Sequence, residues 1–324
     1  MKVLHIEENH SSLIEGLKAL GFQNDLAYGD TVDEILTKLD QYDGIIIRSK
    51  YPINEAFLAP AKKLKFIGRV GAGLENIDLK AVESRNIHLL NAPEGNRNAV
   101  GEHALGMLLS LMNRLKAGHA SIQSGQWNRE DHRGWELSGR TVGIIGYGNT
   151  GKSFAKRISG FDVITICYDI LDNVGDQFAQ QVDWETLQKQ SEIISLHIPQ
   201  NDLTRGMIDK KFIADMSQPF WLLNTARGSA VITEDLVAGL QSQKIMGAGL
   251  DVLEYETRSF SSIFNGDELT PALLYLLEAE HVLLSPHVAG WSRESHVKLA
   301  NIIVEKVKKL FFLGLFPDHK LSRV

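Results

Sequence analysis

A G-x-G-x-x-G pattern at residues 146–151 constrains the fold of this chain more than any other feature of its sequence. An apolar run at residues 142–145 precedes the pattern and is typical of a buried parallel strand. Helix-compatible residues follow, and a second apolar run at residues 163–167 leads to Asp169. A strand, a glycine turn, a helix and a strand in this order predict the start of a doubly wound α/β unit.

Each glycine of the pattern meets a steric requirement of dinucleotide binding. Gly146 permits the tight turn, Gly148 lets a pyrophosphate approach the backbone, and Gly151 lets the helix lie close to the strand. The helix N-terminus would then face the diphosphate, and Asp169 would accept hydrogen bonds from the adenosine ribose. Asp169 would also repel a 2′-phosphate, and Ile170 supplies no cation to bind one, so the cofactor predicted is NAD. A glycine-rich turn without a ligand is the alternative.

Length and charge exclude several other classes of protein. A chain of 324 residues predicts two domains. A formal net charge of −6 argues against general binding to nucleic acid or to an anionic membrane. Cys167 is the lone cysteine, so no disulfide can form within the chain, and no apolar run reaches membrane-spanning length. We expect a cytoplasmic protein without a signal peptide and without a metal.

The order of apolar runs predicts two α/β domains, each a doubly wound parallel sheet. Strands alternate with helices over roughly the first ninety residues, and a second α/β unit begins at residue 141. Residues 96–116 are expected to form one long helix, apolar on more than one face, that is either a core helix or covered by a partner chain in a dimer. Residues 118–140 are expected to form a connecting excursion or an arm that packs on another subunit. Ser11 or Ser12 should cap the first helix, and Thr31 with Glu34 forms a capping box for the second.

Three residues with catalytic potential follow three predicted strands of the second unit. Arg227, Glu256 and His287 come after apolar runs, and ligands in open α/β sheets bind beyond the carboxyl ends of strands. Each has an ordinary explanation by itself: a surface ion pair, a solvated loop acid and a loop histidine. Together they fit hydride transfer, in which an imidazole takes the hydroxyl proton, a carboxylate orients it, and a guanidinium holds the substrate carboxylate.

An ordered set of segments resembles the D-isomer-specific 2-hydroxyacid dehydrogenases, and within that family the phosphoglycerate dehydrogenases most of all. The segments are 68–78 (GRVGAGLENID), 91–93 (NAP), 99–104 (AVGEHA), 146–151, 196–199 (LHIP), 224–228 (NTARG), 251–256 (DVLEYE) and 286–290 (PHVAG). The resemblance implies that Arg227, Glu256 and His287 are catalytic, and it implies a homodimer built on the cofactor domain. It assigns cofactor contacts to Tyr147, Gly148, Asn149, Thr150, Asp169, Pro199, Thr204, Thr225, Ala226, Asp251 and Gly290. It assigns substrate contacts to Arg48, Ser49, Val70, Gly71, Ala72 and Gly73.

This resemblance also implies the division of the chain. Residues 1–96 and 291–324 would form a flavodoxin-like substrate domain, and residues 97–290 an NAD-binding Rossmann domain. No regulatory domain is expected after residue 324. Two departures concern the catalytic loops: Thr257 stands where a proline is usual, and residues 258–270 look like an insertion.

The expected activity is hydride transfer between NAD and a D-2-hydroxy acid, with 3-phosphoglycerate as the favoured substrate and serine biosynthesis as the implied role. Arg48 and Lys50, two apart beyond an apolar strand, would point the same way and bind a phosphate if the chain stays extended. They could instead be solvated cations. A glyoxylate or hydroxypyruvate reductase is the alternative enzyme, and an NAD(H)-sensing interaction protein with little turnover is the alternative from another class.

Overall fold

The computed structural model describes residues 1–256 and 269–314, and most of the expected insertion at 258–270 lies outside them. The chain divides into two compact units. The first combines Met1–Asn96 with the described residues from Trp291 on, and the second is Arg97–Gly290. No helix in the described part of the chain combines the length and apolar character needed to cross a lipid bilayer.

The first unit is built on a five-stranded parallel sheet in the order β2-β1-β3-β4-β5. The strands are β1 (Lys2–His5), β2 (Gln23–Leu26), β3 (Gly44–Ile47), β4 (Phe66–Arg69) and β5 (His88–Asn91). All four residues of β3 are buried, as its run of isoleucines predicts for a central parallel strand. The strand order reverses between β1 and β3, which is the kind of position at which doubly wound sheets bind ligands.

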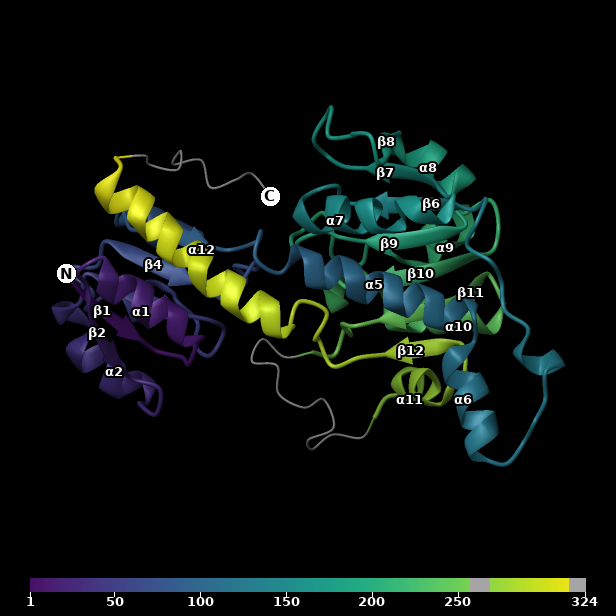
Figure 1. The fold of residues 1–324 in the computed structure, drawn as a ribbon, viewed down its shortest axis with the longest axis horizontal. Coiled ribbons are helices and arrows are strands. Elements are labelled where there is room, and N and C mark those ends of the chain that lie inside the picture. Colours follow the sequence, from purple (N-terminus) through teal and green to yellow (C-terminus); the bar gives the residue numbers. More distant parts are fainter. Residues whose placement is uncertain (257–268, 315–324) are drawn as a thin grey trace. The chain divides into compact units, whose positions relative to one another are not determined.

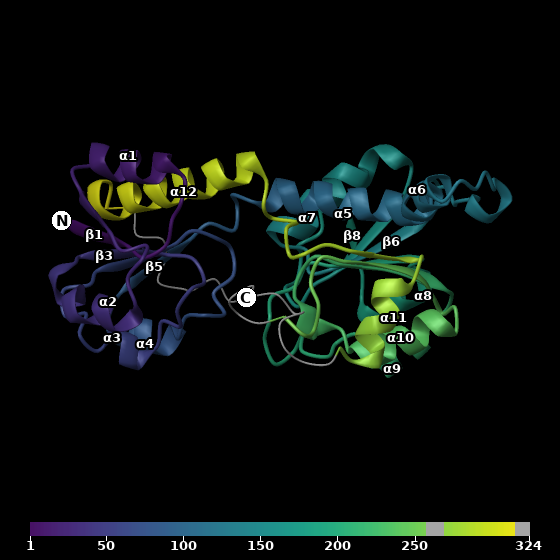
Figure 2. The ribbon, with the colours of Figure 1, turned by 90° about the horizontal axis from the view of Figure 1, so that it is seen from below.

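Two layers of helices cover this sheet. One face carries α1 (Ser11–Ala19) and α12 (Arg293–Phe312), which pack on each other and on the sheet (Figure 2). The other face carries α2 (Val32–Lys38), α3 (Glu55–Leu58) and α4 (Leu79–Ser84) (Figure 2). The C-terminal helix therefore completes the first unit, and the predicted flavodoxin-like strand order is confirmed.

The second unit has a seven-stranded parallel sheet in the order β12-β11-β10-β9-β6-β7-β8 (Figure 1). Its strands are β6 (Thr141–Ile145), β7 (Ile164–Tyr168), β8 (Gln180–Gln181), β9 (Ile193–Leu196), β10 (Phe220–Asn224), β11 (Ile245–Leu250) and β12 (Val282–Leu284). This is the predicted Rossmann arrangement, with the order reversing between β6 and β9. The short polar strand β8 has no apolar signal and was not predicted.

The helices of the second unit also form two layers. One face of the sheet packs on α5 (Arg97–Met112) and α7 (Asn149–Ile158) (Figure 2). The opposite face packs on α8 (Trp184–Gln190), α9 (Lys210–Asp215), α10 (Thr233–Gln241) and α11 (Pro271–Glu278). Burial on both faces thus explains the apolar sequences of the central strands β6, β9, β10 and β11.

Two local predictions were wrong. The helix expected over residues 96–116 ends at Met112, and a separate helix α6 (Leu115–Gln123) begins after Arg114, whose φ of 51° is left-handed. The excursion expected over residues 118–140 therefore begins as a helix. The cap of α1 is His10 rather than Ser11 or Ser12, because its imidazole accepts a hydrogen bond from the Ser12 N–H. The capping box of Thr31 and Glu34 is confirmed.

Candidate active site

The glycine turn after β6 has the shape that a dinucleotide requires. Gly146 adopts a left-handed φ of 87°, and a Cβ atom there would lie 2.5 Å from the His197 carbonyl oxygen. A Cβ atom on Gly151 would lie 2.2 Å from the Gly146 carbonyl oxygen, so α7 could not approach the strand with any larger residue. A Cβ atom on Gly148 would meet no heavy atom within 4 Å. Gly146 and Gly151 serve packing, whereas Gly148 borders open space suited to a pyrophosphate.

The start of α7 supplies donors for that diphosphate. Asn149 and Thr150 open the helix after Gly148, and the first N–H groups of an α-helix have no acceptor within the helix. Asp169 braces the turn, since its Oδ2 accepts the Tyr147 N–H at 2.7 Å. Its Oδ1 accepts the Leu171 N–H at 3.0 Å. The residues present therefore fit a bound NAD.

Tyr147 has a second role, which is structural. Its ring is buried, and its hydroxyl donates to Asp176 Oδ1 at 2.7 Å. Burial and then this hydrogen bond raise the pKa of the Tyr147 phenol, so the group stays neutral. The side chain ties the glycine turn to the segment after β7.

Two further strand-end segments carry four more residues predicted to contact the cofactor, namely Pro199, Thr204, Thr225 and Ala226. After β9, the buried Thr204 donates its hydroxyl to the Pro199 carbonyl at 2.7 Å and closes a tight loop. After β10, Asn224 Oδ1 accepts the Ala226 N–H at 3.1 Å. The Thr225 hydroxyl is buried and has no hydrogen-bond partner among the described residues. A buried hydroxyl in that state indicates a missing partner, such as a ligand or a water molecule.

The structure brings Glu256 and His287 together. His287 Nδ1 lies 2.7 Å from Glu256 Oε2, and both side chains are only about a quarter exposed. Glu256 Oε1 accepts the Leu253 N–H at 2.6 Å, which fixes the orientation of the carboxylate. Because Nδ1 is engaged with the carboxylate, proton exchange with a substrate would take place at Nε2.

His287 itself has an unusual backbone. Its φ of 55° lies in the left-handed region, which non-glycine residues seldom adopt and which costs about 1–3 kcal/mol. Its N–H donates to the carbonyl oxygen of Asp251 at 2.8 Å. A strained histidine in a bonded loop is consistent with a precisely oriented functional group.

Asp251, predicted as a cofactor contact, holds this histidine loop. Its side chain is 1% exposed, and Oδ1 accepts the Ser285 hydroxyl at 2.5 Å and the Val288 N–H at 2.9 Å. Its Oδ2 accepts the Ala289 N–H at 2.8 Å. His103 Nε2 lies 2.9 Å from the Ser285 hydroxyl and extends the network to α5. Sequence reasoning missed His103 and Ser285, although His103 stands within one of the family segments.

Arg227 lies on the turn after β10. One guanidinium nitrogen, Nη1, donates to the Ala226 carbonyl at 2.7 Å, and Asn224 Nδ2 donates to the Arg227 carbonyl at 3.0 Å. A Cβ atom on the adjacent Gly228 would lie 1.9 Å from the Leu253 carbonyl oxygen. The turn of Arg227 therefore packs on the backbone of the segment that ends in Glu256.

In the first unit, the residues predicted to contact the substrate lie at the strand ends. Glu7, just beyond β1, accepts backbone hydrogen bonds from Arg48 at 2.5 Å and from Ser49 and Lys50 at 3.1 Å. The Arg48 guanidinium lies 4.2 Å from the ring centroid of Trp291. Lys50 Nζ instead faces the carbonyl oxygens of Tyr28 at 3.3 Å and Asp30 at 3.5 Å. The expectation that Arg48 and Lys50 act together was therefore wrong, because Glu7 bends the chain between them.

The segment from Val70 to Gly73 offers backbone donors. Val70 donates to the Ile47 carbonyl and Gly71 to the Arg69 carbonyl. Within the described residues, the N–H groups of Ala72 and Gly73 have no acceptor. Two neighbouring N–H groups without an acceptor are donors of the kind that can bind a carboxylate.

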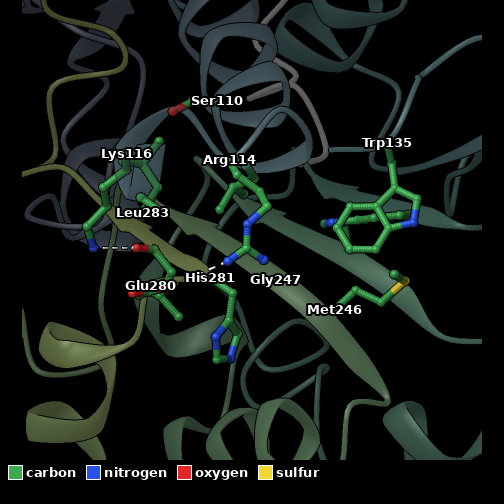
Figure 3. Close-up of a pocket in the computed structure, with 13 residues that line it drawn as sticks. Ser110, Arg114, Lys116, Trp135, Met246, Gly247, Glu280, His281 and Leu283 are labelled. Carbon is green, nitrogen blue, oxygen red and sulfur yellow. Dashed lines mark hydrogen bonds and ion pairs between the residues drawn. The ribbon is translucent and has the colours of Figure 1, made fainter. Parts of the chain in front are cut away.

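A separate cavity of about 40 Å³ lies elsewhere in the second unit (Figure 3). Arg114, Trp135 and His281 line it, together with Trp221 and Gly247, which lie near the amino ends of β10 and β11. Arg227 and His287 follow the carboxyl ends of strands in the same sheet. The cavity is therefore at the opposite edge of the sheet from the candidate catalytic residues, and we assign it no part in the chemistry.

Comparison with known proteins identifies the relatives of this chain. A family model described as "D-isomer specific 2-hydroxyacid dehydrogenase, NAD binding domain" matches residues 105–289. The hydroxypyruvate reductase of Thermotoga maritima is 34% identical over 277 residues, which cover 86% of this chain and 87% of that protein. The D-3-phosphoglycerate dehydrogenase of Archaeoglobus fulgidus is 31% identical over 312 residues, or 95% of this chain. This chain spans only 56% of the length of that dehydrogenase.

Solved structures of two dehydrogenases are similar in fold to this chain. D-2-hydroxyisocaproate dehydrogenase matches with a TM-score of 0.83 at 26% identity, covering 97% of this chain and 98% of that one. The D-lactate dehydrogenase of Aquifex aeolicus, solved with NAD and lactic acid, matches with a TM-score of 0.80 at 26% identity. That match covers 96% of this chain and 95% of the other.

Proposed function

This chain belongs to the D-isomer-specific 2-hydroxyacid dehydrogenase family, and from that premise we propose that it transfers a hydride between NAD and a D-2-hydroxy acid. The observation that carries the proposal is the 2.7 Å contact between His287 Nδ1 and Glu256 Oε2. A carboxylate-oriented imidazole at the end of a strand in an NAD-binding sheet is the apparatus needed to move the hydroxyl proton.

His287 is the proposed acid–base residue. In the oxidation direction, Nε2 accepts the proton of the substrate hydroxyl, and in the reduction direction it returns the proton to the carbonyl oxygen. Glu256 holds the ring through Nδ1 and stabilises the imidazolium that forms. When bound, NAD takes up the hydride that leaves the carbon bearing the hydroxyl.

Two carboxylate-binding elements are proposed, each within its own unit: Arg227 in the second unit and the segment 70–73 in the first. A guanidinium can form two parallel hydrogen bonds with a carboxylate and polarise the reacting oxygen. The free N–H groups of Ala72 and Gly73 suit a carboxylate as well. Both assignments agree with the positions at which the family segments occur in this sequence.

For the substrate we propose 3-phosphoglycerate and its keto acid, 3-phosphohydroxypyruvate. The support is Arg48, whose guanidinium contacts the Trp291 ring and donates no side-chain hydrogen bond to a described residue. Burial lowers the pKa of Arg48 and the charge of the nearby Glu7 opposes that effect, so the unused donors of a partly buried cation are what we assign to an anionic group of the substrate. The alternative is hydroxypyruvate or glyoxylate, which is favoured by the similarity to the Thermotoga maritima protein named hydroxypyruvate reductase.

A panel of 2-keto acids assayed with NADH tests this proposal. The panel should include 3-phosphohydroxypyruvate, hydroxypyruvate, glyoxylate and 2-oxoglutarate. We expect kcat/KM for the phosphorylated acid to exceed that for hydroxypyruvate by at least tenfold, the effect of one charge-assisted contact. Equal reduction of hydroxypyruvate or glyoxylate would replace the phosphoglycerate assignment with the reductase.

We also propose that the enzyme is a homodimer formed by the second unit. The segment after α6 carries Trp127, which is 83% exposed, and Trp135, which is 39% exposed. Large exposed indole rings on an extended segment favour a contact with another chain. Sedimentation equilibrium should give twice the chain mass of 36.1 kDa, and a monomer at micromolar concentration would contradict the proposal.

A further inference from the structure

Four side chains of the first unit gather at the point where its strand order reverses. Arg48 follows β3, and His10 caps the helix that follows β1. His296 lies in the first turns of α12, and Trp291 just precedes that helix. Because β1 and β3 are neighbours at the reversal, this is where an open parallel sheet is expected to bind a ligand.

Ring contacts hold the cluster together. The Trp291 ring centroid lies 5.1 Å from that of His296, and the His296 centroid lies 5.6 Å from that of His10 in an edge-on arrangement. Trp291 also covers the Arg48 guanidinium at 4.2 Å. Stacking of this kind orients the N–H groups at the edge of the guanidinium while leaving them free to donate.

Several side-chain nitrogens of the cluster have no hydrogen-bond partner among the described residues. His296 Nε2 is buried and has no hydrogen-bond partner within residues 1–256 and 269–314. His10 Nδ1 accepts the Ser12 N–H at 3.3 Å, so a neutral His10 carries its proton on Nε2. The Arg48 side chain likewise donates to no acceptor in the described part of the chain. Three donor groups in one cluster are thus left to a ligand.

The charges around the cluster agree with an anion. Burial, then Arg48 and then His10, lower the pKa of His296, so positive groups surround it. Glu8 acts in the opposite direction. The Glu7 carboxylate accepts the backbone N–H groups of residues 48–50 and forms no salt bridge with the guanidinium, but its charge acts on Arg48 and opposes the lowering of the Arg48 pKa by burial.

We propose that Arg48, His10 and His296 form a subsite for the phosphate group of the substrate, with Trp291 as the platform that orients Arg48. The proposal rests on the proposed function and adds two histidines that the sequence did not single out. It also removes Lys50, whose ammonium faces the Tyr28 and Asp30 carbonyls. A phosphate offers three acceptor oxygens, which matches three separate donor side chains better than a planar carboxylate does.

Kinetics with paired substrates test the subsite. His296→Phe keeps the ring contacts and removes the donor, and His10→Asn keeps a helix cap and removes the imidazole. The measured quantity is the ratio of kcat/KM for 3-phosphohydroxypyruvate to kcat/KM for hydroxypyruvate. Each variant should lower this ratio about tenfold, which corresponds to ~1.4 kcal/mol, through a higher KM for the phosphorylated acid. Lys50→Gln is the matched control and should leave the ratio at its wild-type value.

The possible outcomes distinguish a failure of the proposed phosphate subsite from a failure of the proposed function. If both acids are reduced and neither histidine variant changes the ratio, the subsite is wrong and the proposed function stands. Should no 2-keto acid be reduced at all, the proposed function itself fails. A preference for 2-oxoglutarate that is lost in His296→Phe would overturn the phosphate assignment in favour of a second carboxylate.

Inhibition of the wild-type enzyme supplies a test that does not depend on the folding of any variant. Inorganic phosphate should compete with 3-phosphohydroxypyruvate and leave the reduction of hydroxypyruvate unaffected, because only the former uses the subsite. Equal inhibition with both substrates, or with neither, would contradict the proposal.

Discussion

Asp251 and Arg48 each follow the last residue of a buried parallel strand, but their side chains differ in hydrogen bonding. Asp251 is enclosed, and its carboxylate accepts hydrogen bonds from Ser285, Val288 and Ala289. Arg48 lies against the Trp291 ring and donates no side-chain hydrogen bond to any described residue. The first group belongs to the second unit and the other to the first unit.

The difference separates two kinds of strand-end residue. Buried polar groups are almost always hydrogen-bonded, so a saturated group such as Asp251 stabilises the loop around it. A group whose donors are unused is instead available to a ligand. By this criterion the second unit holds a fixed pair, Glu256 and His287, for which we propose acid–base chemistry, and the first unit holds the cluster for which we propose anion binding. The variants below test whether the two regions divide chemistry and substrate selection in this way.

The largest effect is expected for His287. His287→Ala removes the proposed acid–base group, so kcat should fall by about 10² or more, the usual scale of general acid–base catalysis. Binding of NADH, measured by fluorescence titration, should persist because the glycine turn is untouched. A variant with near-normal kcat would break the assignment of chemistry to the second unit.

We expect kcat/KM with NADH to exceed kcat/KM with NADPH by about a hundredfold. Asp169 places a carboxylate beside the glycine turn, and Ile170 offers no cation for a 2′-phosphate. An unpaired charge contact of a few kcal/mol corresponds to roughly that factor in kcat/KM. Steady-state rates with NADH and NADPH measure it, and equal values would show that Asp169 does not select the cofactor.

Glu256→Gln tests whether Glu256 stabilises the protonated form of His287. The imidazolium of His287 loses its anionic partner, so its protonated form is less stable. In the reduction direction the enzyme needs that protonated form, so kcat for reduction should fall by about tenfold, equivalent to ~1.4 kcal/mol, while binding of NADH persists. An unchanged kcat would mean that Glu256 does not act on His287.

Ser285→Ala should have the smallest effect. The change removes one of three donors to Asp251 and the contact with His103, so the histidine loop loses part of its support. We expect a few-fold fall in kcat and a loss of about 1 kcal/mol in the free energy of unfolding. Ser124→Ala, at an exposed serine after α6, is the control. If Ser285→Ala behaves like this control, the saturated network does not position His287.

Much of the fold was predictable because its strands are buried on both faces. Their continuous apolar runs locate them, and Gly146 and Gly151 mark the turn at which steric contacts leave no room for a Cβ atom. Arg227, Glu256 and His287 were found for a related reason, since each follows a strand. The sequence alone could not place Glu256 beside His287, as the two are brought together by the tertiary structure.

The errors arose where distant residues determine local structure. The break between α5 and α6 depends on the Trp135 N–H, which donates to the Met112 carbonyl at 2.9 Å. The separation of Arg48 from Lys50 depends on Glu7, which is remote in sequence and bonds three successive N–H groups. The secondary-structure propensities of the neighbouring residues give no information about either contact. His10 and His296 were missed because nothing in either sequence neighbourhood indicates that the two rings meet.

The most direct test of this division is a comparison of His287→Ala with Arg48→Ala on two substrates, 3-phosphohydroxypyruvate and hydroxypyruvate. His287→Ala should lower kcat for both acids by the same factor. Arg48→Ala should lower the ratio of their kcat/KM values by about ten- to a hundredfold, the effect of a partly buried charge-assisted contact. If Arg48→Ala affected both acids equally, or if His287→Ala affected only the phosphorylated one, the division of chemistry and substrate selection between the two units would be contradicted.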